Sequence, residues 1–254
     1  MSLSTDSSSA TSAMPISESK EQAHQSKRRA FVLGALIGDA LGLPVHRKPH
    51  HIVRMYFKGI KGYTDEYYST ASPTGLRAGQ NSKDARLILR QLPPSLDASI
   101  AYFVPAFFAV QPDSAALLVR FFQMMSRVQT PLDAQVIVPQ LFAPDMQEKI
   151  LSVLEFFPND MVLEFEEAMS EPQAIAFAIA MLLRAHDDFE TTVLSTVNMG
   201  GLTSLTGAIV GGAMGLLHGE TALPKVWIEE LEHSAEILTL LGVPREDEAG
   251  HTGK

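Results

Sequence analysis

Apolar residues recur along most of the chain at spacings of three and four, the pattern of helices that bury one face. The pattern begins near Arg28, is interrupted between Pro44 and Ala78, and resumes at Ser82. Prolines, glycines and Asp or Asn residues separate the periodic runs, as at helix boundaries. No stretch alternates apolar and polar residues for long enough to predict a strand. The pattern therefore predicts an all-α protein.

The interruptions divide the pattern into successive helices. We expect helices over residues 28–43, 84–92, 95–110, 113–128, from 131 onward, and over 145–157, 161–169, 171–185, 187–197, 203–217 and 224–241. The segment from Pro44 to Ala78 is expected to be a long loop with at most short helical turns. Loops of that length in a compact domain are usually functional or disordered.

Both ends of the chain differ from the middle. Residues 1–27 are rich in Ser and poor in large apolar residues, which predicts a disordered tail. Residues 28–243 are expected to form a single helical domain, and residues 244–254 a polar tail. The apolar run Leu202–Leu217 is shorter than the roughly 20 residues that span a bilayer. We expect no membrane association and a cytoplasmic location.

Composition narrows the classes of function. Of the 254 residues, 46% are hydrophobic, which supports a sizeable core. The net charge of −9 argues against nucleic acid as the main partner, because phosphate backbones need a basic face. The absence of cysteine excludes disulfides, thiolate metal sites and cysteine nucleophiles.

Two runs of glycines recur every four residues: Gly34, Gly38 and Gly42, and then Gly207, Gly211, Gly215 and Gly219. On a helix this spacing places the members of each run on one face. Each glycine costs on the order of 1 kcal/mol relative to alanine in a helix. The simplest compensation is close contact between helix backbones, so we expect the two glycine faces to pack near each other.

Three segments carry a resemblance to a known family. They read GDALGLP from Gly38, GQNSKDARL from Gly79 and NMGGLTSLTGAI from Asn198. In this order they resemble the three motifs of ADP-ribosylglycohydrolases. The resemblance implies a compact all-helical bundle with a cleft among the helix ends. It also implies two magnesium ions between the second and third motifs, and cleavage of a glycosidic bond of ADP-ribose.

The match fails at the positions where the family places its acids. His46 stands at the position of the assisting Glu, and Lys83 at that of the second motif's first Asp. Ala85 replaces the closing Thr of that motif, Leu202 and Ser204 replace the two Asp of the third motif, and Leu205 replaces its last Thr. Magnesium prefers carboxylate oxygens, so this set is too poor for two ions. We expect no cofactor, although the family uses magnesium.

The candidate site residues follow from that comparison. No residue is assigned a catalytic role; His46 is noted for its position, and Asp84 as the best surviving acid. The ligand-binding candidates are Asp39, Asn198, Gly200 and Gly201. Ser82, Asp84 and Thr203 are the remnants of the metal site, and Lys83 is expected to pair with Asp84.

Three hypotheses remain open. The chain is a catalytically impaired relative that binds ADP-ribose, a nucleotide or an ADP-ribosylated protein. Alternatively, it is an active hydrolase with altered or metal-independent chemistry, in which Asp39, Asp84 or His46 acts as acid or base. The third is a structural or partner-binding helical protein. The sequence leaves the oligomeric state open.

Overall fold

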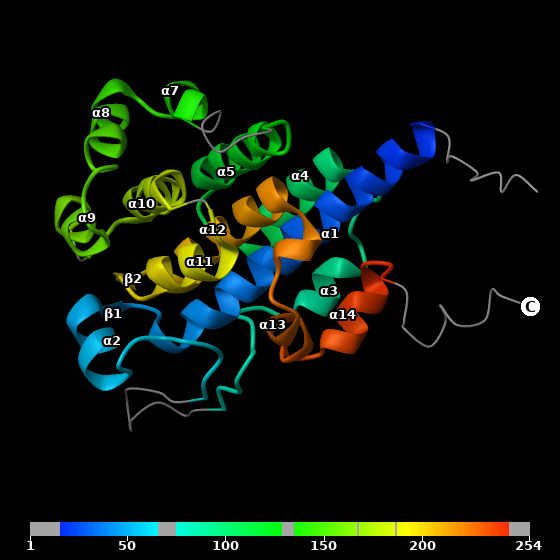
Figure 1. Ribbon diagram of the computed structural model, residues 1–254, viewed down its shortest axis with the longest axis horizontal. Helices are drawn as coiled ribbons and strands as arrows, with labels where there is room; N and C mark the ends of the chain where they lie inside the picture. The colour runs from blue at the N-terminus through cyan, green and yellow to red at the C-terminus, as the bar shows by residue number, and fades with distance from the viewer. Residues whose placement is uncertain (1–15, 66–74, 129–134, 167, 186, 244–254) are drawn as a thin grey trace, which may run out of the picture.

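The computed structural model describes residues 16–65, 75–128, 135–166, 168–185 and 187–243. Two long helices, α1 (Ile16–Gly42) and α12 (Thr203–His218), cross in the middle of the molecule (Figure 1). Other helices surround this pair, so the predicted all-α fold is confirmed. The strands in the described part are β1 (Lys48–Pro49) and β2 (Gly200–Gly201), which pair antiparallel with Lys48 opposite Gly201.

The remaining elements pack around the central pair. In chain order they are η1 (Leu43–Val45), α2 (His50–Tyr56), α3 (Ala85–Leu89), α4 (Leu96–Phe107), α5 (Pro112–Met125), η2 (Gln135–Ile137), α7 (Val138–Leu141), α8 (Pro144–Ser152), α9 (Pro158–Phe165), α10 (Glu171–Arg184), α11 (Phe189–Val197), η3 (Glu220–Ala222), α13 (Lys225–Glu229) and α14 (Ser234–Leu240). Figure 1 shows α7, α8 and α9 along one edge, and α3, α13 and α14 gathered at the opposite side.

The two glycine faces pack against each other, as predicted. A Cβ atom added at Gly34 would overlap the backbone carbonyl of Gly211, and one at Gly38 would overlap that of Gly207. Gly215 lies in the same way against the carbonyl of Ala30. Gly219 has a different role, because it ends α12 with a φ of 76° and faces open space. Close backbone contact between α1 and α12 therefore explains the glycines inside the helices.

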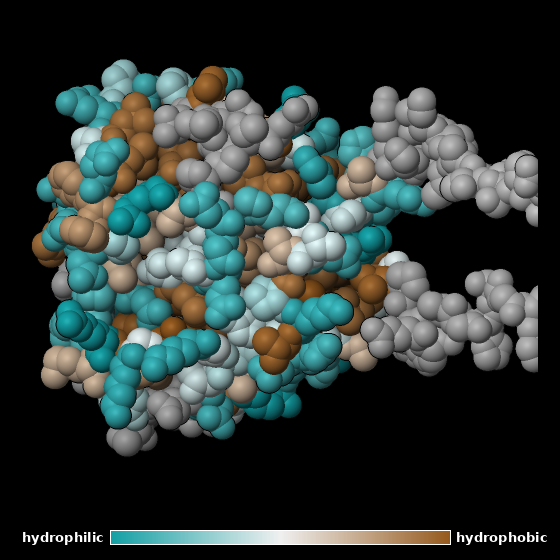
Figure 2. Space-filling model, viewed as in Figure 1, coloured by the Kyte–Doolittle hydropathy of each residue, from teal (hydrophilic) through white to brown (hydrophobic). Residues whose placement is uncertain are grey.

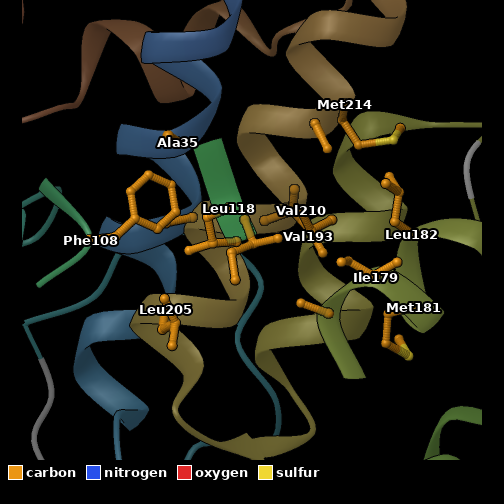
Figure 3. Close-up of a cluster of buried hydrophobic side chains, with 14 of the residues drawn as sticks. Ala35, Phe108, Leu118, Ile179, Met181, Leu182, Val193, Leu205, Val210 and Met214 are labelled. Atoms are coloured by element: carbon orange, nitrogen blue, oxygen red, sulfur yellow. The ribbon is translucent and has the colours of Figure 1, made fainter. Parts of the chain in front are cut away.

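One continuous apolar core includes this pair and the helices that pack against it. Figure 3 shows side chains of α10, α11 and α12 meeting there, among them Ile179, Val193 and Val210. Helix α10 is buried along almost its whole length, from Ala174 to Leu183. On the face seen in Figure 2, hydrophilic residues are widespread, with patches of hydrophobic residues between them. None of the helices described is both long enough and apolar enough to cross a membrane.

The first helix is longer than expected. It begins at Ile16 rather than at Arg28, so residues 16–27 belong to α1 and not to a disordered tail. These residues include Glu, Gln and Lys, which have good helix propensity and extend an existing helix at little cost. Gln25 donates from Nε2 to the carbonyl of Pro94 at 3.3 Å, and Lys27 donates to that of Ser126 at 3.1 Å. Residues 1–15 and 244–254 lie outside the described residues.

Two other expectations need correction. The segment expected to be a loop contains a seven-residue helix, α2, which starts after Pro49 and so needs no amide proton from it. The single helix expected over residues 224–241 is two, α13 and α14. His233 interrupts it with a left-handed φ of 63°, and the nearby amide of Glu232 bonds to the carbonyl of Gly79. The expected helix start at Pro131 falls outside the described residues.

Candidate functional site

Asp39 lies where the three motif segments meet. It projects from α1 and is only 2% exposed. Its Oδ1 accepts a hydrogen bond from Ser204 Oγ at 2.6 Å. Its Oδ2 accepts from the backbone amide of Ser82 at 2.7 Å and from Asn81 Nδ2 at 3.1 Å. One carboxylate therefore links α1, the turn before α3 and the first turn of α12.

Burial raises the pKa of the Asp39 carboxyl, because a charge is costly away from water. The hydrogen bonds from Ser204, Ser82 and Asn81 act in the opposite direction, since they favour the charged form. The upward shift of the pKa means that desolvation prevails over the three donors.

His46 lies on the other side of Ser204. Its Nδ1 accepts a hydrogen bond from the backbone amide of Ser204 at 3.2 Å. A neutral imidazole whose Nδ1 accepts must carry its proton on Nε2. Burial lowers the pKa of His46, and the neighbouring charge of Arg47 lowers it further, so the ring is held neutral. As a neutral ring that accepts at Nδ1, His46 therefore has its Nε2–H as a hydrogen-bond donor.

These residues line a cleft of about 250 Å³, which we call the motif cleft. Its polar walls include Asp39, His46, Arg47, Ser82, Glu171 and Ser204, and its apolar walls include Phe107, Phe108, Leu202 and Leu205. Glu171 begins α10, and its Oε1 accepts from the amide of Gln111 at 3.0 Å. In the sequence, Glu171 and Pro172 open a helix and fit the family's pattern, but nothing there predicts that Glu171 lies at the site.

Asp84 is placed differently from Asp39. It caps α3 by accepting from the amide of Arg86 at 3.1 Å, and its carboxylate pairs with the Arg86 guanidinium at 2.9 Å. Its side chain is 38% exposed and lines a separate polar cleft with Arg77, Lys83 and Glu232. The contact with Arg86 lowers the pKa of Asp84. Of these two motif residues, Asp39 lines the motif cleft and Asp84 does not.

Lys83 does not take the expected partner. Its Nζ donates to the carbonyl of Ala106, in the last turn of α4, at 2.6 Å. A cation at this helix end meets unpaired carbonyls and the negative end of the helix dipole. The interaction that we predicted between Lys83 and Asp84 is thus replaced by Lys83 with α4 and Asp84 with Arg86.

The oxygen donors left between the motifs do not fit two magnesium ions. Thr203 is fully buried and donates from Oγ1 to the carbonyl of Gly42 at 2.7 Å. The Ser204 hydroxyl is committed to Asp39. Within the described residues, no group of three or more His, Cys, Asp or Glu side chains could hold a metal ion. The two carboxylates that line the motif cleft, Asp39 and Glu171, already accept hydrogen bonds from the protein, which is a poor ligand set for two magnesium ions.

The other ligand-binding candidates lie at the junction of β1 and β2. Asn198 donates from Nδ2 to the carbonyl of Ile60 at 3.0 Å, and its Oδ1 accepts from the Ile60 amide at 2.6 Å. Gly200 has a left-handed φ of 79°, and a Cβ there would meet the carbonyl of Lys48. The carbonyl of Gly201 accepts from the amide of Arg47 at 2.7 Å. These residues hold the chain after His46 against the start of α12.

A second cleft adjoins the first beside this junction. It has a volume of about 580 Å³, and we call it the adjoining cleft. Arg47, Glu171 and Leu202 line both clefts. Its other walls are formed by Lys48, Pro49, Ala168, Met169 and Gly201. Its volume lies in the range of sites for small molecules.

The structure is thus that of an all-helical protein in which the motif cleft and the adjoining cleft lie next to each other near the helix ends. The sequence model of the ADP-ribosylglycohydrolase family matches residues 93–249, a range that contains the third motif and begins after the first two. Because this match covers more than half of the chain, the chain belongs to the ADP-ribosylglycohydrolase family.

Two further comparisons concern individual proteins. A solved structure described as an "ADP-ribosylglycohydrolase-related protein complex" aligns over 87% of this chain and 97% of its own, with 17% identity and a TM-score of 0.47. No curated protein matches the chain.

Proposed function

We propose that this protein is a catalytically impaired member of the ADP-ribosylglycohydrolase family, which lacks the dinuclear magnesium site and binds ADP-ribose or an ADP-ribosylated protein without cleaving it. The observation that carries the proposal is the state of the motif cleft. It keeps one buried carboxylate, Asp39, and both oxygens of that carboxylate already accept hydrogen bonds from the protein. A carboxylate engaged in this way is poorly available to a metal or a substrate.

The residues at the lost positions support the same proposal. Leu202 offers no oxygen ligand, and His46 offers a neutral donor instead of an acid. The fold is kept nevertheless: the glycine faces of α1 and α12 still pack, and the motif cleft is still open. The scaffold that forms the cleft is thus retained without the acids that the family's chemistry uses.

The test measures cleavage and binding separately. The full chain is incubated with ADP-ribosyl-arginine, ADP-ribosyl-serine and O-acetyl-ADP-ribose, with and without magnesium. We expect no release of ADP-ribose above the uncatalysed rate, and saturable calorimetric binding of ADP-ribose that does not depend on magnesium. Hydrolysis that disappears in Asp39→Asn would overturn the proposal, and so would a failure of ADP-ribose to bind.

An active hydrolase is the second candidate, and one observation favours it. Asp39 and Glu171 both line the motif cleft, and cleavage of a glycosidic bond normally uses two carboxyl groups. The raised pKa of Asp39 suits a general acid. Under this alternative, Asp39→Asn and Glu171→Gln would each abolish release of ADP-ribose, whereas Asp84→Asn would leave it unchanged.

A purely structural or partner-binding role is the third candidate. Phe157, which precedes α9, and Leu163 within α9 are 73% and 67% exposed, which is unusual for large apolar side chains. An open motif cleft speaks against this role as the only one. If Phe157→Ser with Leu163→Ser abolished self-association in ultracentrifugation, and ADP-ribose failed to bind the wild type, this alternative would replace our proposal.

A further inference from the structure

Arg47 stands out among the residues that line the two clefts. It is exposed, lies between the clefts and lines both of them. Its backbone has a left-handed φ of 61°, which few residues other than glycine adopt. Ala109, which lines the motif cleft, shares this conformation with a φ of 55°. Strained conformations of this kind persist where the surrounding structure enforces them, often beside a ligand.

The strain at Arg47 has an identifiable source. Its amide donates to the carbonyl of Gly201 at 2.7 Å, and the next residue, Lys48, pairs with Gly201 in the β1–β2 ladder. The turn after η1 is therefore fixed on both sides of the Arg47 side chain. Because the backbone at Arg47 is already fixed, binding a ligand there has to order the side chain alone.

The charges around the two clefts are uneven. The chain as a whole carries −9, yet Arg47 and Lys48 place two cations side by side on the adjoining cleft. The acid on the same wall, Glu171, already accepts from the amide of Gln111. A guanidinium matches a carboxylate or phosphate through two parallel hydrogen bonds. The local chemistry thus favours one anionic group beside Arg47.

The remaining walls are apolar. Leu202 lies at the boundary of the two clefts, where the resemblance implies an Asp in the family. Met169 and Pro49 continue this surface in the adjoining cleft. An apolar body of one or two rings would cover this surface while its anionic end meets Arg47. The volume of about 580 Å³ accommodates such a molecule.

We propose that the adjoining cleft binds a small organic anion, an aryl phosphate or aryl carboxylate, with its charge on Arg47 and its apolar body against Leu202 and Met169. The proposal concerns a different cleft from the one in which ADP-ribose binding is proposed, and needs neither metal nor turnover. Hydrolysis of ADP-ribosyl bonds would therefore overturn the proposed function and leave this proposal standing.

The test uses 2-naphthyl phosphate as the probe, followed by its own fluorescence in a titration with the full chain without magnesium. We expect saturable binding that weakens at least about tenfold in Arg47→Asn, the loss of one charge-assisted contact. Asparagine tolerates the left-handed backbone, so the fold is kept. Lys58→Asn is the matched control, since Lys58 is also exposed and left-handed, with a φ of 55°, but lies on neither cleft.

Two further measurements separate the charge from the apolar body. The neutral analogue 2-naphthol should bind at least about tenfold more weakly than the phosphate. Leu202→Asn should weaken the binding of 2-naphthyl phosphate. Inorganic phosphate, which has no apolar body, should bind the wild type and this variant equally. Equal binding of 2-naphthyl phosphate by wild type and Arg47→Asn would overturn the proposal. Equal affinities of the wild type for 2-naphthyl phosphate and 2-naphthol would also overturn it.

Discussion

At the scale of single residues, Asp39 is the group on which most of the site depends. Its carboxyl joins three segments that lie far apart in the sequence, through Asn81, Ser82 and Ser204. The sequence suggested Asp39 as a ligand-binding residue and Asp84 as the best surviving acid. The sequence around Asp84 could not show that Arg86 would pair with its carboxylate. A surface arginine can pair with a nearby acid or extend into solvent, and the sequence pattern is the same in both cases.

The raised pKa of Asp39 predicts how stability depends on pH. Because the folded state holds this proton more tightly than the unfolded state, the contribution of Asp39 to stability is full below about pH 4. That contribution is lost as pH rises through the raised folded pKa. The free energy of unfolding of wild type minus that of Asp39→Asn should therefore decrease from pH 4 to pH 8, measured by urea denaturation. Asparagine is chosen because it can still accept from Ser82 and donate to Ser204.

Asp84→Asn provides a control of opposite sign. The pKa of Asp84 is lowered in the folded state. The stability that this carboxylate contributes is therefore present above the pKa of the unfolded state, and is lost as pH falls through the pKa of the folded state. The difference between wild type and Asp84→Asn should therefore increase with pH in the acid range. A pH-independent difference for Asp39→Asn would show that the carboxyl is not desolvated as described.

At the scale of elements, the contact of α1 with α12 was the most predictable part of the fold. Glycines at a spacing of four could be inferred to face another backbone, because their helical cost needs a compensation. The short elements were not predictable in this way. The β1–β2 pair is two residues long, and the segment between α13 and α14 contains a hydrogen bond from the amide of Glu232 to the distant carbonyl of Gly79.

Gly38→Ala tests the contact between these helices. The added Cβ would overlap the carbonyl of Gly207, so the two backbones must separate. We expect a loss of about 2 kcal/mol or more in the free energy of unfolding, despite the better helix propensity of alanine. Gly62→Ala is the control, since its Cβ would lie 3.9 Å from Trp227 Nε1, and should change stability by no more than about 0.5 kcal/mol. A Gly38→Ala protein as stable as wild type would contradict the packing.

At the scale of the whole molecule, the all-α fold is that of the family, and our proposal adds that the family's acids are replaced at the helix ends. The family fold could be inferred from three strings, and the loss of the acids stays a prediction from the same strings. The contacts that these residues make could not be inferred from the sequence. Lys83 donates a hydrogen bond to the carbonyl of Ala106, and Ser204 donates one to Asp39. These contacts depend on where other helices end, which the local sequence does not encode. The same holds for Arg47, whose importance rests on a backbone conformation.

Restoring the family's acids tests the whole assignment. The triple variant Lys83→Asp, Leu202→Asp, Ser204→Asp should bind magnesium in calorimetry, whereas the wild type should not. Without metal, an Asp at 204 places a second carboxylate beside the buried Asp39, and like charges so close oppose folding. The triple variant should therefore unfold at a lower temperature than wild type, and magnesium should raise its midpoint by mass action.

The double variant Lys83→Asp, Leu202→Asp guards against a triple variant that fails to fold. It keeps the Ser204 hydroxyl on Asp39, so its stability without metal should stay nearer to that of wild type. It should gain a weaker response to magnesium than the triple variant, because it has one carboxylate fewer at the third motif. If neither variant responds to magnesium, residues 83, 202 and 204 do not correspond to the family's metal positions. The proposal that this chain lost a magnesium site at those residues would then fail, although its place in the family would not.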